Sequence, residues 1–316
     1  MAARWAVKGP HRIASAGVEA WTTLDKSNVA VWAQYPDIGT RSPLPVIVLC
    51  HGLGGGHRGY NALGAYLASH GYAVLHPQFL DSFALASARL GLVDVDERTW
   101  PSDRHAREQI YPMLFDPHHW VSRVARVHAV TDSLARQRHL PVRLVPDGVI
   151  LAGHSYGAYT AQLVLGTALF GVGLDGERFT HPAVVAGILM SPQGSGDRGL
   201  TARSWAAVEL PLLVVTGTND RGPRGESLRW RRQPFDAAPC RLKHLAVVRD
   251  GDHYLGGIPL AEAEEGRASD VQVRRAVSAV MVAFVDRVRG DRSAGAWLAS
   301  SPFSEILAHE HQGLST

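Results

Sequence analysis

The sequence predicts an α/β fold, in which helices cover both faces of a mainly parallel, twisted β-sheet and an antiparallel hairpin precedes it. Two observations lead to this prediction. From residue 46 onward, short apolar runs alternate with helical segments, and this alternation is typical of parallel sheets. Residues 18–35 instead contain two strand-like pieces around Asp25, Lys26 and Ser27, which is the pattern of an antiparallel hairpin.

Each further element follows from its local pattern. Continuous apolar runs indicate strands that are buried on both faces, and apolar residues three or four positions apart indicate helices. We expect strands at residues 45–50, 73–75, 147–152, 184–190, 211–216 and 244–248. We expect helices at residues 60–69, 121–137, 156–169, 202–208, 224–232 and 270–289. Each strand is thus followed by a helix, as connections between parallel strands require.

One long segment interrupts this alternation. Residues 77–118 have weak periodicity and contain four prolines, so we expect an excursion over one end of the sheet, with short helical pieces and a candidate lid. No linker or internal repeat is visible, so residues 1–316 are expected to form one domain. Residues 290–316 are expected to form a short tail. Its expected packing residues are Trp297, Leu298 and Phe303.

The composition is that of a globular protein with a sizeable core, because 46% of the 316 residues are hydrophobic. The net charge of +3 is spread along the chain and does not indicate a nucleic-acid partner. No apolar stretch reaches the roughly 18 residues of a membrane span. The first residues also lack the apolar segment of a secretory signal, so the default expectation is a soluble, cytoplasmic protein.

The cysteines and histidines do not indicate a disulfide framework or a metal site. Cys50 and Cys240 are the only cysteines, and Cys50, at the end of an apolar run, is expected to pack as a small hydrophobe. Asp116, His118 and His119 offer ligand atoms, but without a zinc-site spacing they are interpreted as part of a hydrated loop. We therefore expect neither a metal nor another cofactor.

A cluster of arginines lies in the second half of the chain. It is either a solvated helix face or a patch beside the site that binds an anionic substrate or partner, and the sequence leaves both interpretations open. The cluster consists of Arg221, Arg224, Arg229, Arg231 and Arg232.

The chemistry is indicated first by the pentapeptide Gly153-His154-Ser155-Tyr156-Gly157, which directly follows a predicted strand and precedes a predicted helix. This G-x-S-x-G pattern is typical of a nucleophile elbow, a sharp turn that exposes a serine hydroxyl above a sheet. The flanking glycines are needed because the turn is strained and the new helix passes close to the strand. Ser155 is therefore the candidate nucleophile.

A serine nucleophile needs a base, and the base needs an orienting acid. In this arrangement the chain order is nucleophile, acid, histidine. Asp220 follows the predicted strand at 211–216, and His253 follows the strand at 244–248, so both are expected at the carboxyl edge of the sheet with Ser155. The rival acids are Asp197, Asp250 and Asp252, of which the last two are expected to shape the histidine loop.

An oxyanion would also need two backbone donors. We expect one to be the N–H of Tyr156, the residue after the nucleophile, and the other the N–H of Leu53 in the glycine-rich loop after the first parallel strand. His51 is expected to hold that loop by hydrogen bonds. The candidate substrate-binding residues are His57, Tyr60, Phe79, Trp100 and Trp120, with core packing an equal alternative for the aromatic residues and a solvated loop the alternative for His57.

The same glycine-rich loop carries a competing signal. Gly54, Gly56 and Gly59 satisfy G-x-G-x-x-G, and Asp81 lies where a ribose-binding acid would, which would make the protein a dinucleotide-binding oxidoreductase. The glycines begin several residues after the strand, however, and not in the tight turn at its end. This interpretation also leaves the ordered Ser155, Asp220 and His253 without a role.

Residues from about 45 to 290 resemble an α/β-hydrolase. Within that superfamily, the segments 51–54 (His-Gly-Leu-Gly), 67–72 (Leu-Ala-Ser-His-Gly-Tyr) and 153–157 resemble platelet-activating-factor acetylhydrolase-like and dienelactone-hydrolase-like serine esterases, with polyester-degrading cutinase-like enzymes as similar relatives. The resemblance implies the α/β-hydrolase fold and cofactor-free hydrolysis of small carboxylic esters with short to medium acyl groups. Dienelactone hydrolases proper use cysteine, so lactone chemistry is not implied here.

The resemblance assigns the triad to Ser155, Asp220 and His253, and the oxyanion donors to Leu53 and Tyr156. A thioesterase, a peptidase and a polyester hydrolase remain alternatives on the same machinery. An alternative of another class is a non-catalytic binding protein with a hydrolase fold. The complete set of triad residues argues against it.

Overall fold

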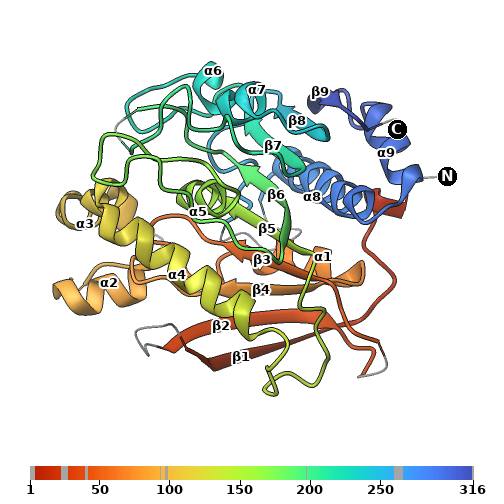
Figure 1. Cartoon of the computed structure of the whole chain (residues 1–316), viewed down its shortest axis with the longest axis horizontal. Coiled ribbons are helices and arrows are strands. Elements are labelled where there is room, and N and C mark those ends of the chain that lie inside the picture. The colour runs from red at the N-terminus through yellow and green to blue at the C-terminus, as the bar shows by residue number, and fades with distance from the viewer. Residues whose placement is uncertain are drawn as a thin grey trace.

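The protein contains one nine-stranded sheet (Figure 1), in a computed structural model that describes residues 4–22, 28–39, 42–92, 94–96, 99–196, 198–259 and 266–314. The strands are β1 (Ile13–Thr22), β2 (Asn28–Pro36), β3 (Val46–Cys50), β4 (Ala73–Pro77), β5 (Val149–His154), β6 (Val184–Met190), β7 (Leu212–Gly217), β8 (Lys243–Val248) and β9 (Leu307–Gln312). Their order across the sheet is β1-β2-β4-β3-β5-β6-β7-β8-β9. The six strands from β4 to β8 in this order are parallel, and β1–β2, β2–β4 and β8–β9 are antiparallel pairs.

Helices lie on both faces of this sheet, as the sequence predicts. Helices α4 and α5 cover one face, and α1 and α8 cover the other (Figure 1). The helices are α1 (Asn61–Ser69), α2 (Phe83–Leu90), α3 (Arg104–Ile110), α4 (Pro117–Ser133), α5 (Tyr156–Val164), α6 (Leu228–Arg231), α7 (Gln233–Ala237), α8 (Ala268–Val288) and α9 (Arg292–Ala299). Among the described helices, none combines the length and the apolar composition that crossing a membrane requires.

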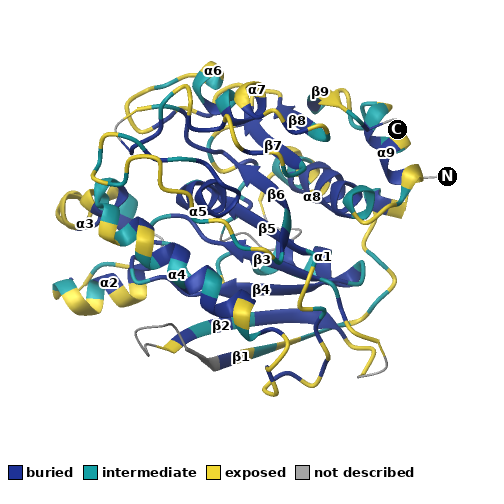
Figure 2. Cartoon of the chain, viewed as in Figure 1, coloured by how far each residue is buried: buried dark blue, intermediate teal, exposed yellow. Residues whose placement is uncertain are grey.

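The apolar core forms two layers, one against each face of the sheet, and Figure 2 shows the central strands and α5 as buried. Successive residues of β3 alternate between the layers. Val46 and Val48 pack with α4 and α5, whereas Ile47 and Leu49 pack with α1 and α8. A strand that is buried on both faces must be apolar at every position, which is why β3 reads as a continuous apolar run.

The excursion at 77–118 is a mixture of short helices with its own small apolar cluster. It contains α2, α3 and two 3₁₀ turns at Trp100–Ser102 and Tyr111–Phe115. The cluster joins Phe83, Leu92, Trp100, Ile110 and Met113, together with two buried alanines. Two buried hydrogen bonds fix this segment to the main body. The Tyr156 hydroxyl donates to the Met113 carbonyl, and Trp120 Nε1–H donates to the Leu114 carbonyl.

The structure corrects three local expectations. Residues 202–208 form turns, not a helix, and the helix expected at 224–232 is only the short α6, followed by α7. The segment around His118 is not a hydrated loop but the start of α4, because the Asp116 carboxylate caps this helix by accepting from the His118 N–H. These segments are short or rich in polar residues, so their periodicity is a weak signal.

The segment at 290–316 contributes more than a packed tail. It forms α9 and then β9, which adds an antiparallel edge strand beside β8. Leu298 is fully buried, and the Trp297 ring lies 5.1 Å from the ring of Trp5 and 6.0 Å from that of Phe303. The strand escaped prediction because its sequence, Leu-Ala-His-Glu-His-Gln, is mostly polar and exposed, as suits an edge strand.

Two buried histidines of the sheet lie in strands β4 and β8, in addition to His154 at the end of β5. His76 lies in β4 and His244 in β8, and each side chain is almost fully inaccessible to solvent. Burial, aided by the neighbouring His57 for His76 and by His309 for His244, lowers the pKa of each imidazole to about 3. Both residues are therefore neutral in the folded protein at ordinary pH.

We expect the free energy of unfolding to decrease as the pH falls from about 6.5 toward 3. In that window the unfolded chain binds protons at His76 and His244, while the folded protein leaves them neutral, so each residue contributes up to about 1.4 kcal/mol per pH unit. Urea unfolding between about pH 7.5 and pH 5 measures this slope. The variant His76→Gln should lose stability less steeply, and equal slopes in the two proteins would contradict the expectation.

Candidate active site

The predicted nucleophile elbow is a sharp turn between β5 and α5. Ser155 has φ +54° and ψ −119°, a left-handed backbone that a residue with a side chain rarely adopts. The glycines beside it are needed for space. A Cβ on Gly153 would lie 2.2 Å from the Gly157 carbonyl oxygen, and a Cβ on Gly157 would lie 2.0 Å from the Cys50 carbonyl oxygen. Gly153 thus lets the start of α5 pass close to β5, and Gly157 lets it pass close to β3.

The structure brings Ser155, His253 and Asp220 into one hydrogen-bonded row. His253 Nε2 lies 2.9 Å from Ser155 Oγ, and His253 Nδ1 lies 2.8 Å from Asp220 Oδ1. The three residues follow β5, β8 and β7, whose carboxyl ends meet at the same edge of the sheet. An imidazole between a hydroxyl and a carboxylate can take the hydroxyl proton while the carboxylate orients the ring.

The acid of this row is buried and strongly held. Asp220 is fully inaccessible to solvent; its Oδ2 accepts from the Thr216 hydroxyl at 2.9 Å, and its Oδ1 lies 3.0 Å from Arg231 Nη2. Burial raises the pKa of this carboxyl group, but the hydrogen bond from His253 and the charge of Arg231 outweigh it and lower the pKa to about 2. Asp220 is therefore ionised at any pH near neutrality.

A directed chain of hydrogen bonds joins three loops around Ser155. The carbonyl of His253 can only accept, so His154 Nε2, at 2.7 Å, must carry the proton. His154 Nδ1 then accepts from the Tyr60 hydroxyl at 2.9 Å, and that oxygen accepts from the Gly52 N–H at 3.3 Å. Burial, together with the nearby His253, lowers the pKa of His154 to about 3, so the ring is neutral as the chain requires.

The loop after β3 is held by buried polar groups. His51 accepts from the Phe79 N–H through Nε2 and therefore donates from Nδ1 to the Gly52 carbonyl, at 2.7 Å. Beneath it, Arg123 of α4 donates to the His51 carbonyl and forms a buried ion pair with Asp81 at 2.6 Å. Asp81 is thus enclosed within the protein, so the structure does not place it as the ribose-binding acid of the dinucleotide interpretation.

A cavity of about 580 Å³, here called the Ser155 cavity, opens in front of this row. Its lining includes aromatic and apolar residues, several of which come from the excursion at 77–118. Three arginines and a glutamine also line it. The lining includes Ser155 and His253, then Leu53, Tyr60, Trp100, Tyr111, Leu114, Tyr254 and Pro259, and then Gln193, Arg198, Arg221 and Arg231.

Only some of the expected binding residues face this cavity. Tyr60 and Trp100 line it, whereas the other three candidates do not, and the expectation for these three is corrected. His57 contacts Gln78 instead. Gln78 Oε1 lies 2.7 Å from the backbone N of His57 and 2.7 Å from His57 Nδ1. Phe79 packs in the core with the Arg123 guanidinium 3.9 Å from its ring centre, and Trp120 packs edge-on against Tyr159.

The two residues expected to supply oxyanion donors lie on different elements: Tyr156 directly follows Ser155 in the chain, and Leu53 lies in the loop after β3. Leu53 is among the residues that line the cavity. Tyr156 is the first residue of α5, where an N–H has no acceptor within the helix. Its side chain is fully buried, and its hydroxyl donates to the Met113 carbonyl in the excursion.

The structure also locates the rival acids and the clustered arginines that it describes. Asp252 accepts from the Tyr254 N–H, and the backbone N–H of Asp250 donates to Thr218, so both shape the histidine loop. Asp197 lies outside the described residues. Of the five clustered arginines, Arg221 and Arg231 line the Ser155 cavity. Neither the buried Arg231 nor the small α6 was evident from the sequence, in which the five arginines look alike.

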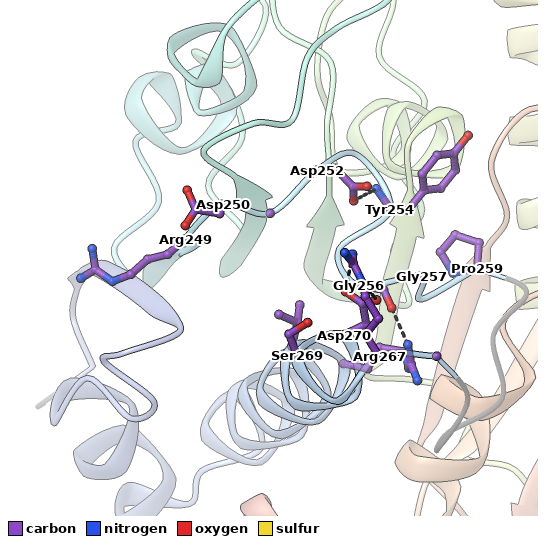
Figure 3. A pocket seen from close by; sticks show the side chains of 14 residues that line it. Arg249, Asp250, Asp252, Tyr254, Gly256, Gly257, Pro259, Arg267, Ser269 and Asp270 are labelled. Atoms are coloured by element: carbon purple, nitrogen blue, oxygen red, sulfur yellow. Dashed lines mark hydrogen bonds and ion pairs between the residues drawn. The ribbon is translucent and has the colours of Figure 1, made fainter.

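A second cavity, of about 700 Å³, lies between the loop 249–259 and the start of α8 (Figure 3). Its charged residues come from both sides and include an ion pair of 2.9 Å between Arg267 and Asp270. It shares only Tyr254 and Pro259 with the Ser155 cavity. No histidine or cysteine is among its described lining residues, so it offers no imidazole base or thiol beside Ser269.

Comparison with known proteins agrees with this architecture. The model of the alpha/beta hydrolase family matches residues 47–309. The chain therefore belongs to the alpha/beta hydrolase family. Membership of this family supports the interpretation that the protein is a hydrolase. The narrower resemblance to platelet-activating-factor acetylhydrolase-like and dienelactone-hydrolase-like esterases stays a prediction. A search of curated proteins gives no match.

The hydrogen-bonded chain through Tyr60 makes a prediction about stability. The variant Tyr60→Phe removes the hydroxyl and leaves the Gly52 N–H and His154 Nδ1 buried without partners, so the free energy of unfolding should fall by about 1–3 kcal/mol. Urea unfolding at neutral pH measures the loss. Tyr254 is half exposed and its hydroxyl has no hydrogen bond among the described residues, so Tyr254→Phe is the matched control, with little change expected. Equal stability of the two variants would argue against the chain.

Proposed function

We propose that this protein is a serine hydrolase that cleaves carboxylic esters with short to medium acyl groups. The observation that supports it most is the row of Ser155, His253 and Asp220, with separations of 2.9 Å and 2.8 Å between the paired atoms. Such a row makes a serine hydroxyl reactive at neutral pH without any cofactor.

The proposed reaction has two halves. His253 Nε2 removes the hydroxyl proton as Ser155 Oγ attacks the ester carbonyl, and the same nitrogen then donates that proton to the leaving alcohol. The acyl group remains on Ser155 until a water molecule, deprotonated by His253, attacks it; the bond between the acyl carbon and Ser155 Oγ then breaks, and His253 returns the proton to Oγ as the acid leaves. Asp220, ionised and fixed by its partners, holds the imidazole with Nδ1–H toward Oδ1 and stabilises the imidazolium that forms in each half.

The proposed oxyanion donors are the backbone N–H groups of Tyr156 and Leu53. The first is a free N–H at the start of α5, where the helix dipole also favours negative charge. The second lies in the loop that His51 and the Arg123–Asp81 ion pair hold from below. Donors that are fixed before the reaction contribute about 10²–10³ in rate each, because nothing must reorganise as charge develops.

The size and lining of the Ser155 cavity suit a small organic ester. Its volume of about 580 Å³ lies within the usual range of ligand pockets, about 300–1,000 Å³. Trp100, Tyr111 and Leu114 offer an apolar wall for an acyl or alcohol group. Thioesters, peptides and polyesters present the same kind of carbonyl to the same row, so a substrate panel is needed to separate these activities.

The first test is the variant Ser155→Ala. We expect kcat/KM for p-nitrophenyl butyrate to fall at least about 10³-fold, because no nucleophile remains, while the melting temperature stays near that of the wild type. Ser87 lies on α2, where its hydroxyl reaches only the Ala84 carbonyl, so Ser87→Ala is the matched control and should retain activity. Wild-type turnover by Ser155→Ala would refute the proposed nucleophile.

A chain-length series of p-nitrophenyl esters, with thiol esters of the same acyl groups, then defines the substrate. The proposal expects oxygen esters with short to medium acyl chains to have the highest kcat/KM. A preference for the thiol esters in every pair would favour a thioesterase instead.

A further inference from the structure

One arginine of the cluster differs from the other four by its burial. The side chain of Arg231 is 1% exposed, whereas Arg221, Arg224 and Arg229 are exposed and Arg232 is partly exposed. Removing a guanidinium from water is costly unless its charge is paired and its N–H groups are hydrogen-bonded. A buried arginine beside the Ser155 row therefore needs its partners identified.

The two terminal nitrogens of Arg231 are surrounded by acceptors, whereas its buried Nε has no hydrogen-bond partner among the described residues. Nη1 donates to the carbonyls of Ser191 and Pro192, at 3.0 and 2.9 Å. Nη2 donates to the Arg221 carbonyl at 3.0 Å, and the same nitrogen forms an ion pair with Asp220 Oδ1 at 3.0 Å. The guanidinium thus connects the loop after β6 with the loop after β7, and the second of these loops carries Asp220.

The contact between Arg231 and His253 shows how these groups are arranged. Nη2 lies within hydrogen-bond distance of His253 Nδ1, at 3.1 Å, and is also ion-paired with Asp220 Oδ1. His253 Nδ1 is 2.8 Å from the same Oδ1 and can donate to it. Oδ1 is therefore held by the imidazole and by the positive charge of the guanidinium together, and its position is determined from two directions.

We propose that Arg231 is a positioning residue for the triad, which fixes the Asp220 carboxylate in its ionised form with Oδ1 directed at His253 Nδ1. This inference rests on the ester hydrolysis proposed above. Arg231 acts through Asp220 and not on the substrate. Lysine could not replace it, because an ammonium group has three N–H donors on a flexible stem and cannot reach four acceptors in one plane.

The electrostatic surroundings of this pair are mixed. Burial raises the pKa of Asp220, whereas the hydrogen bond from His253 and the charge of Arg231 lower it. Without Arg231 the pKa of Asp220 must therefore rise, and the carboxyl group would become protonated at a higher pH than in the wild type. The other ionisable groups facing the pair are His253, His154, Arg198 and Glu226.

The test compares Arg231→Met and Arg231→Lys with the wild type and with Arg229→Met, a change at an exposed position of the same helix. Both Arg231 variants should lose kcat on the order of 10- to 100-fold on p-nitrophenyl butyrate, with KM nearly unchanged, because a misdirected imidazole affects the chemistry and not the binding. The acid limb of the pH profile of kcat/KM should also move to higher pH in Arg231→Met. Arg229→Met should match the wild type in both respects.

Chemical rescue of kcat is a further test, because a residue with only a structural role would not be replaced by a small cation. Arg231→Ala removes the side chain and leaves space for a small cation. Millimolar guanidinium chloride should then raise kcat several-fold, whereas sodium chloride at equal ionic strength should not. The melting temperatures of all variants report whether they fold. If Arg231→Met or Arg231→Ala does not fold, Arg231→Lys, which keeps the charge and most of the volume, tests the positioning role.

Wild-type kcat and an unmoved acid limb in folded Arg231→Lys and Arg231→Met would overturn the proposal. Loss of kcat without a moved acid limb and without rescue would also overturn it, because the residue would then be only a structural support. Failure of the underlying function looks different. In that case the wild type itself would not hydrolyse the esters, or Ser155→Ala would hydrolyse them equally well.

Discussion

The site depends on one constraint, the parallel pairing of β3, β5, β6, β7 and β8. Parallel strands that lie side by side end at the same edge, so the loops that follow them meet whatever their separation in the chain. The loop of Leu53, the turn at Ser155, and the loops of Asp220 and His253 follow four of these strands. This shared edge brings the Ser155 row together, and the two antiparallel borders of the sheet add breadth without adding to the row.

The region behind the site is polar as well as buried, in contrast to the two apolar layers of the core. Arg123 and Arg231 are both nearly inaccessible to solvent, and each is paired with a buried carboxylate, Asp81 and Asp220 respectively. Replacing such pairs by apolar residues often leaves stability unchanged, so they are weak evidence for stability. Both pairs instead lie against loops at the edge of the sheet, where their hydrogen bonds limit how the backbone can move.

The features that the sequence predicted well are those with a strong local signal. The glycines at 153 and 157 indicated the elbow because only glycine fits the close approach of α5 to β5 and β3, and continuous apolar runs indicated the central strands. Features with weak local signals were missed or misplaced. The polar strand β9 resembles a loop in sequence, and Phe79 and Trp120 resemble pocket residues because an aromatic side chain suits a core and a pocket equally.

The sequence by itself determined the order of the central strands and the main helices, the strained turn at Ser155, and the chain order of Ser155, Asp220 and His253, because each follows from local composition and spacing. Only the tertiary structure decided which aromatic residues face the cavity and which of five similar arginines is buried beside Asp220. The physical reason is that burial and pairing arise from contacts between segments far apart in the chain. No local pattern encodes those contacts, because an arginine is the same letter in the sequence whether its guanidinium lies in water or against a carboxylate.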